Sequence, residues 1–193
     1  MRVPTATYLA LPLEAHALLR DVPLRDVTAI DLPGGGADCT LDDVRALLPH
    51  GAGGNPGVRA LFWLRWQVGR LFRWDTPTHD RPELSYLGRV PPELRARSLV
   101  PPGSHEGFFK VLYRLDREML LETRNATVHA FLASVLQPVP GGYRLLWAVY
   151  VEPVSALTAV YMAIIEPFRR FVVYPSIMRQ LRRRWLARAS YSS

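Results

Sequence analysis

The segment Tyr161–Trp185, YMAIIEPFRRFVVYPSIMRQLRRRW, combines apolar runs with two prolines and a cluster of arginines. The longest uncharged run in this region extends from Pro153 to Ile165, whereas a helix that spans a bilayer needs roughly 18 or more apolar residues. Glu166 and the two arginines after it would each be costly to place in hydrocarbon. The segment is therefore expected to lie against protein and not to cross a membrane.

Apolar residues in this segment recur every three or four positions, which is the spacing of one face of an α-helix. This spacing predicts a long amphipathic helix that begins near Ser155 and spans roughly 45 Å. Pro167 and Pro175 each lack an N–H, and we expect each of them to bend or break the helix. The predicted apolar face comprises Leu157, Val160, Ile164, Phe168, Phe171, Val172, Pro175, Met178, Leu181 and Trp185.

Composition is typical of a globular protein, with 49% hydrophobic residues in a chain of 193. This length can form one large core, so we predict a single domain over residues 1–193. Cys39 is the only cysteine, which excludes a disulfide within the chain and favours a cytoplasmic location. The net charge of +7 can reflect arginine-rich codon usage or an anionic partner.

The order of the predicted elements indicates the fold class. A strand at residues 27–32 precedes two helices at 40–48 and 56–74, and a proline-rich loop with one short strand near 85–87 occupies about 76–106. Four runs with a period of two then predict an antiparallel meander at 107–115, 118–123, 127–137 and 142–151. We therefore predict an α+β fold in which a curved antiparallel sheet wraps around the long C-terminal helix. Such a sheet often leaves an apolar cavity for a small molecule.

Two stretches resemble a known protein family. The tail VEPVSALTAVYMAIIEPFRRFVVYPSIMR resembles the C-terminal signature of the bacterial domain-of-unknown-function family 2867, G-x-x-Y-x-x-x-I-x-P-F-H-R. The stretch LFWLRWQVGRLF, at residues 61–72, resembles the family's L-x-x-L-R-x-x-x-x-x-x-F helix. The positions that match the first pattern are Tyr161, Ile165, Pro167, Phe168 and Arg170.

The resemblance implies the helix-grip fold of START and birch-allergen-like proteins, which enclose hydrophobic ligands. Arg169 departs from the family pattern, because it stands where the family has histidine. Thr123, Arg124 and Asn125 likewise stand where the family has an acidic pair. The resemblance therefore implies a fold and a class of ligand, and it implies no reaction.

Candidate site residues come from the sheet and the helices. Arg65 lies in the middle of an apolar helix face, where it can either pair with a carboxylate of the protein or bind the carboxylate of a ligand. His129 and Glu122 are candidates for acid–base chemistry, although a lone strand histidine is more often only hydrogen-bonded. The predicted ligand-binding residues are Arg65, Phe131, Trp147, Tyr150, Glu152 and Tyr161.

The same sequence also allows a different class of function. Arginines alternate with tryptophans on the other face of the predicted helix 56–74, and a second arginine cluster follows residue 178. These residues could form a peripheral surface for an anionic membrane or a nucleic acid, or could simply be solvated and packed under a loop. The residues concerned are Arg59, Trp63, Trp66, Arg70, Arg73, Arg179, Arg182, Arg183, Arg184 and Arg188.

No nucleic-acid motif, histidine spacing typical of a metal site or phosphate loop is found in the sequence. We therefore expect no metal and no cofactor, and the sequence favours a nucleic acid less than a small molecule as the partner. The sequence favours binding of a hydrophobic or amphipathic small molecule, with cyclase- or hydratase-like chemistry left open and the oligomeric state undetermined.

Overall fold

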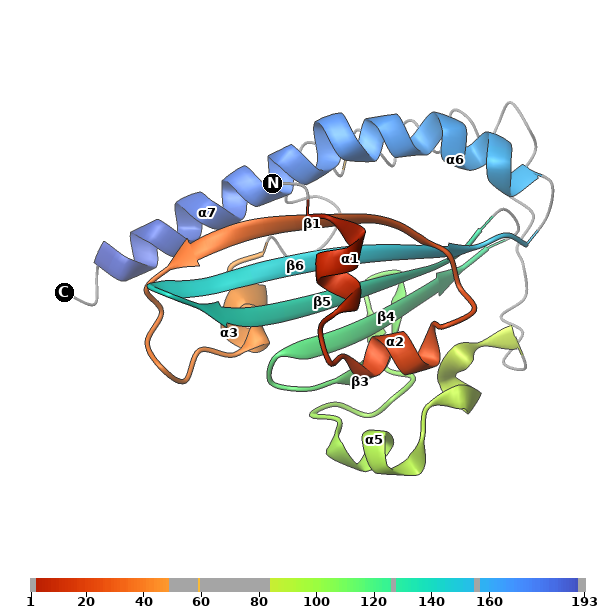
Figure 1. Ribbon diagram of the computed structural model, residues 1–193, viewed down its shortest axis with the longest axis horizontal. Coiled ribbons are helices and arrows are strands. Elements are labelled where there is room, and N and C mark those ends of the chain that lie inside the picture. The colour runs from red at the N-terminus through yellow and green to blue at the C-terminus, as the bar shows by residue number, and fades with distance from the viewer. Residues whose placement is uncertain (1–2, 49–58, 60–83, 126–127, 155–156, 191–193) are drawn as a thin grey trace. The chain divides into compact units, whose positions relative to one another are not determined.

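A computed structural model describes residues 3–48, 59, 84–125, 128–154 and 157–190. It contains a six-stranded antiparallel sheet in the order β1-β6-β5-β4-β3-β2 and a long C-terminal helical segment (Figure 1). These elements and their order are those of a helix-grip fold, so the predicted α+β class is confirmed. The strands are β1 Leu24–Pro33, β2 His105–Glu106, β3 Phe109–Arg114, β4 Glu118–Arg124, β5 His129–Val139 and β6 Gly142–Glu152. The helices are α1 Thr5–Leu9, α2 Glu14–Leu18, α3 Leu41–Ala46, η3 Tyr86–Arg89, α5 Pro92–Arg97, α6 Leu157–Phe168, η4 Arg169–Val173 and α7 Tyr174–Ser190.

The chain divides into two compact units. Unit 1 comprises Met1–Asp43, Arg81–Arg124 and His129–Glu152, and it contains the sheet. Unit 2 comprises Val44–Asp80, Asn125–Val128 and Pro153–Ser193, and it contains the C-terminal helices. The single domain expected over residues 1–193 remains a prediction.

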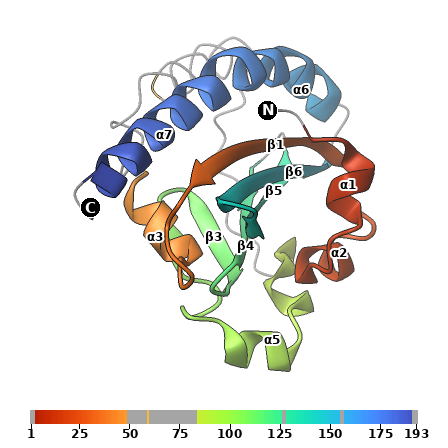
Figure 2. The ribbon, with the colours of Figure 1, turned by 60° about the vertical axis from the view of Figure 1, so that its left-hand side comes forward.

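The sheet is built around the long hairpin of β5 and β6. These strands pair along their whole length, from His129 opposite Glu152 to Val139 opposite Gly142. Gly142 has a φ of +156°, and a Cβ there would lie 2.3 Å from the carbonyl oxygen of Leu32 on β1. Only glycine therefore allows β1 to approach the hairpin so closely. The curvature of the sheet is visible in Figure 2.

One face of the sheet forms the core of unit 1. The register places Phe131 opposite Tyr150 and Val135 opposite Leu146, all four of which are buried. The N-terminal helices and the 84–97 segment cover this face, and Figure 1 shows α1 crossing β1, β6 and β5. The buried residues they contribute are Tyr8, Ala15, Leu19, Val22, Tyr86, Val90 and Leu94. Helices α1 and α2 were not predicted, because five-residue helices are too short for a recognisable period.

The short helix predicted at residues 40–48 is confirmed as α3. Thr40 and Asp43 cap it reciprocally: the Thr40 N–H donates to Asp43 Oδ2 at 3.0 Å, and the Asp43 N–H contacts Thr40 Oγ1 at 3.4 Å. Of the second predicted helix, at residues 56–74, only Arg59 is among the described residues, and it is helical.

The short strand predicted near residues 85–87 is wrong, because these residues begin the 3₁₀ helix η3. The Ser85 side chain accepts a hydrogen bond from the Leu87 N–H, which closes the turn. The Tyr86 N–H donates to the carboxylate of Glu122 on β4. A side chain from a distant strand therefore satisfies the backbone here, and local sequence gives no sign of it.

In unit 2, α6, η4 and α7 follow one another without a break, and the prolines do not end the helix. The five residues of η4, Arg169–Val173, form a π-helical turn between Pro167 and Pro175. Among the described residues, no helix is both long and apolar enough to cross a membrane.

The buried face of this helix differs from the predicted one in its first half. Met162 and Ile165 are buried, whereas Val160 is 45% exposed and Phe171 is 69% exposed. Beyond η4 the prediction holds for Met178 and its successors Leu181 and Trp185. A π-turn holds one more residue than an α-turn, so a count at α-helical spacing does not carry across η4.

Candidate functional site

Three titratable side chains meet on the core face of the unit 1 sheet. Register places Glu122 on β4 opposite Phe131, and His129 on β5 opposite Glu152 on β6. His129 Nε2 lies 2.7 Å from Glu122 Oε1, and its Nδ1 lies 2.6 Å from Glu152 Oε2. His129 is fully buried. Adjacent strands thus build a carboxylate–imidazole–carboxylate triad, which we call the Glu–His–Glu triad.

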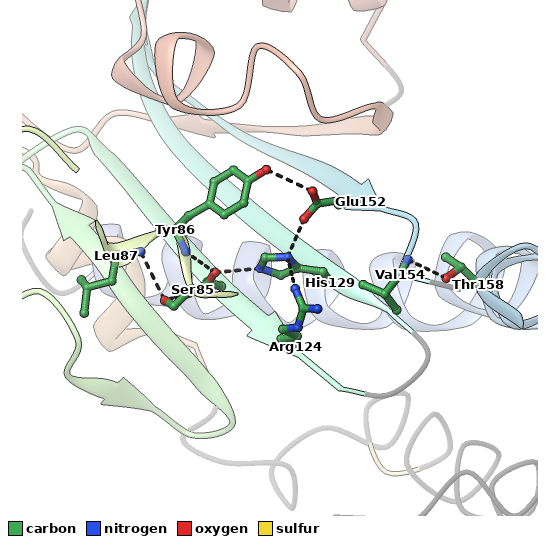
Figure 3. Close-up of polar contacts among 9 residues, drawn as sticks. Ser85, Tyr86, Leu87, Arg124, His129, Glu152, Val154 and Thr158 are labelled. Carbon is green, nitrogen blue, oxygen red and sulfur yellow. Dashed lines mark hydrogen bonds and ion pairs between the residues drawn. The ribbon is translucent and has the colours of Figure 1, made fainter. Parts of the chain in front are cut away.

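The contacts of His129 constrain its protonation. An ionised carboxylate only accepts hydrogen bonds, so contact of both ring nitrogens with ionised carboxylates requires an imidazolium. Arg124 Nη1 also lies 3.1 Å from Nδ1, and a guanidinium only donates. Figure 3 shows Arg124 and Glu152 at the same edge of the His129 ring. Nδ1 therefore has two competing partners that select opposite protonation states: Glu152 favours a proton on Nδ1, and Arg124 favours its absence.

Glu122 is held as a carboxylate despite its burial. Burial by itself raises its pKa, but hydrogen bonds from His129, the Ser85 hydroxyl and the Tyr86 N–H bring the pKa below the usual value of 4.5. The Ser85 Oγ lies 2.5 Å from Glu122 Oε2, and the Tyr86 nitrogen lies 2.8 Å from Oε1. Glu122 consequently joins the triad to the start of η3.

Aromatic rings surround the triad. Tyr86 lies 5.3 Å from His129 and 4.6 Å from Phe131 between ring centroids, and Phe131 lies 4.5 Å from His129. The Tyr86 hydroxyl reaches Glu152 Oε1 at 3.3 Å, as Figure 3 shows. Burial, together with the negative charge of Glu152, raises the pKa of the Tyr86 phenol. The Glu152 side chain is 36% exposed, so the triad reaches solvent at this end.

A second buried carboxylate lies four residues before Glu122, on the same face of β4. Glu118 accepts hydrogen bonds from the Glu14 and Ala15 N–H groups at 3.1 and 2.9 Å, where α2 begins. The Tyr113 hydroxyl donates to the same carboxylate at 2.5 Å. Burial, and then the charge of Glu118, raise the Tyr113 pKa well above its usual value. Each glutamate of β4 thus fastens a distant helical segment to the sheet.

The structure brings together five of the residues selected from sequence: Glu122, His129, Glu152, Phe131 and Tyr150. Trp147 is buried, but it lies on the opposite face of β6 from this group. Arg65 lies outside the described residues, as does the Tyr161 side chain. The same applies to the arginine–tryptophan face, of which only Arg59 is described, as an exposed helical residue.

Sequence reasoning missed Ser85, Tyr86, Arg124 and Glu118. The spacing of Glu118 and Glu122 was a usable signal, since residues four apart in a strand share a face. Ser85 and Tyr86 gave no such signal, because the short strand predicted near residues 85–87 carried no sign of their contact with Glu122.

The described residues contain no group of three or more His, Cys, Asp or Glu side chains that could hold a metal ion. Although the triad has three such side chains, its imidazole nitrogens already face carboxylate oxygens at hydrogen-bonding distance. The contacts of a carboxylate with each ring nitrogen of His129 are of the kind that can transfer a proton.

A model of the family described as "Protein of unknown function (DUF2867)" matches residues 18–176. The match includes β1, the whole sheet and the helix as far as the beginning of α7. Comparison with curated proteins and with solved structures gives no match.

Proposed function

The chain belongs to the DUF2867 family, and we propose that it binds a hydrophobic or amphipathic small molecule in an internal cavity beside the Glu–His–Glu triad. The observation that carries this proposal is the complete burial of His129 between two carboxylates. Strongly coupled acid–base groups in a buried, aromatic setting are characteristic of functional sites. The internal cavity itself is part of the proposal.

A purely structural role accounts for only part of the triad. Glu122 alone satisfies Ser85 and the Tyr86 N–H, and thereby anchors η3. Adding His129 and Glu152 places two more ionisable groups in the same site, and burying charge is costly unless it brings function or specificity. The partial exposure of Glu152 also provides a route for protons between the buried imidazole and a ligand.

The proposed roles follow from position. Phe131, Tyr86 and Tyr150 supply aromatic surface for the apolar part of the ligand, while Glu152 exchanges a proton with it. When Glu152 acts as an acid, it passes a proton to the ligand and recovers one from His129 Nδ1. Arg124 then donates to the free Nδ1 lone pair, so the neutral imidazole keeps a partner. A cyclase- or hydratase-like reaction requires such a transfer, whereas a binding protein would use the site without it.

Native mass spectrometry of the purified full chain tests the binding step. We expect a co-purified small molecule, and we expect the fluorescent amphiphile anilinonaphthalene sulfonate to compete with it. Tyr150→Phe and Glu152→Gln should weaken binding of this probe, whereas Trp147→Phe, on the opposite face, should not. Probe binding that depends on Trp147 but not on Tyr150 would contradict the proposed position.

A matched pair of glutamate variants separates chemistry from folding. Glu118 is buried on the same strand and face as Glu122 but contacts neither His129 nor Glu152. We expect Glu152→Gln to change the pH dependence of ligand binding and Glu118→Gln to leave it unaltered. An identical pH profile for wild type and Glu152→Gln would remove the triad from the function.

A further inference from the structure

The C-terminal helices expose an apolar stripe to solvent. Val160, Ala163, Pro167 and Phe171 recur at intervals of three or four residues, and all four are exposed. Phe171 is 69% exposed and Val160 is 45% exposed, which makes them two of the most exposed large apolar residues described. Buried residues such as Met162 and Ile165 occupy other positions of the same helix. The stripe is therefore a second apolar surface, separate from the buried one.

Arginines continue this exposed surface along α7. Residues 157–190 contain seven arginines and a single acidic residue, Glu166. Arg179, Arg182 and Arg183 are exposed at the spacing of one helix face, and Arg170 stacks near the Phe171 ring at 5.3 Å. The apolar stripe and the exposed arginines together form one surface. This surface is apolar along α6 and η4 and strongly cationic along α7.

We propose that this exposed face of α6, η4 and α7 binds the surface of an anionic membrane. Arginines attract acidic headgroups, and an exposed Phe171 beside them can bury its ring at the boundary between headgroups and acyl chains. On this proposal the helix lies along the membrane surface with its exposed face toward the headgroups. This inference does not depend on the Glu–His–Glu triad or on the proposed ligand.

Charge and apolarity together favour this partner over two others. A nucleic acid would use the arginines but would gain nothing from the aliphatic Val160. A second copy of the chain would cover the apolar stripe but would place arginine against arginine unless an acidic surface faced them. Only an anionic lipid surface satisfies both ends of the face.

Flotation of the full chain with lipid vesicles tests the inference. Wild type should float with vesicles that contain phosphatidylglycerol at low salt, and should not float with phosphatidylcholine alone. Phe171→Ser should lower the partition coefficient for these vesicles about tenfold, because it removes the largest exposed apolar side chain of the stripe. Phe108→Ser is the matched control, since Phe108 is 52% exposed but lies in unit 1 between β2 and β3. Charge reversal at Arg182 and Arg183, each to Glu, should abolish flotation.

Three results would overturn the inference. The first is wild-type protein that fails to float with phosphatidylglycerol vesicles at low salt. The second is flotation of Phe171→Ser equal to that of wild type, which would mean nonspecific attraction of charge. The third is a dimer in sedimentation velocity that Phe171→Ser dissociates, in a protein that binds no vesicles, because a second copy would then cover the stripe.

Discussion

Replacement of Glu122 by leucine tests the most connected side chain of the site. This change places an apolar side chain of similar size on β4 and removes the acceptor of three donors, two of which are buried. The Ser85 hydroxyl, the Tyr86 N–H and His129 Nε2 would all lose their partner. His129 would also keep only one of its two carboxylates.

The magnitude follows from these contacts. Each buried donor left without an acceptor costs about 1–3 kcal/mol, and removing one partner of a buried ion pair costs about 3–5 kcal/mol. The two costs overlap, because the His129 contact belongs to both. We therefore expect Glu122→Leu to lower the free energy of unfolding by about 3–5 kcal/mol. Glu122→Gln keeps an acceptor oxygen and should cost about 1–2 kcal/mol.

Urea denaturation followed by circular dichroism measures the global loss, and hydrogen exchange locates it. Glu122→Gln should accelerate exchange in residues 84–97, which its carboxylate anchors, and leave residues 14–18 protected. Glu118→Gln should do the opposite, since Glu118 caps α2. Equal effects of both variants on both segments would mean that the glutamates do not fasten the helices individually.

The loss of stability in Glu122→Leu should depend on pH in a defined direction. The pKa of Glu122 is lower in the folded protein than its usual 4.5, so its carboxylate stabilises the fold above that value. This stability is lost as the pH falls through the folded pKa. The difference between wild type and Glu122→Leu should therefore be largest at neutral pH and shrink in acid. A difference that stays constant down to about pH 3, or one below about 1 kcal/mol at neutral pH, would refute the reasoning.

Further predictions concern other parts of unit 1. His129→Gln should lower the free energy of unfolding by about 2–4 kcal/mol near neutral pH, measured by urea denaturation, because two carboxylates lose the ring nitrogens that they contact at 2.6 and 2.7 Å. Gly142→Ala should cost about 3 kcal/mol or more through its clash with the Leu32 carbonyl, whereas Gly107→Ala, with open space at φ +61°, should cost about 1–2 kcal/mol, both measured by thermal unfolding. Burial and a neighbouring carboxylate raise the pKa of Tyr113, so stability from its neutral phenol persists below the usual value of 10.0 and is lost as the pH rises through the folded pKa. Its phenolate absorbance should therefore appear together with unfolding in an alkaline titration.

The strands were predictable because their signals are local. Alternation along β6 and the glycines at its start identify a hairpin, and the observed bounds of Gly142–Glu152 differ from the prediction by one residue. The helices that cover the core face of the sheet were not predictable in the same way. The helices α1 and α2 are short, and α2 begins where Glu118, a residue of a distant strand, accepts its first N–H groups. Such long-range capping leaves no period in the local sequence.

The candidate site was half predictable for a similar reason. Glu122, His129 and Glu152 were selected individually as polar residues in apolar strands. Whether their side chains contact one another depends on the register of the strands. A shift of one residue between β5 and β6 would turn His129 and Glu152 to opposite faces. Register is fixed by the hairpin turn and by the buried face, which together set the triad geometry. The partners Ser85 and Tyr86 come from a segment whose conformation the triad itself helps to determine.

The C-terminal helix shows where a correct period still gives a wrong face. Counting back at α-helical spacing from Trp185 and Met178 leads to Phe171, Ile164 and Val160. These three residues were therefore predicted to be buried. The π-turn η4 interrupts that count, and before it the buried residues are Met162 and Ile165. The two prolines that flank this turn explain its position, because each removes an N–H from the α-helical ladder. Val160 and Phe171 consequently face outward, although an uninterrupted α-helical period predicts both to be buried, and that period gives no sign of the π-turn that interrupts it.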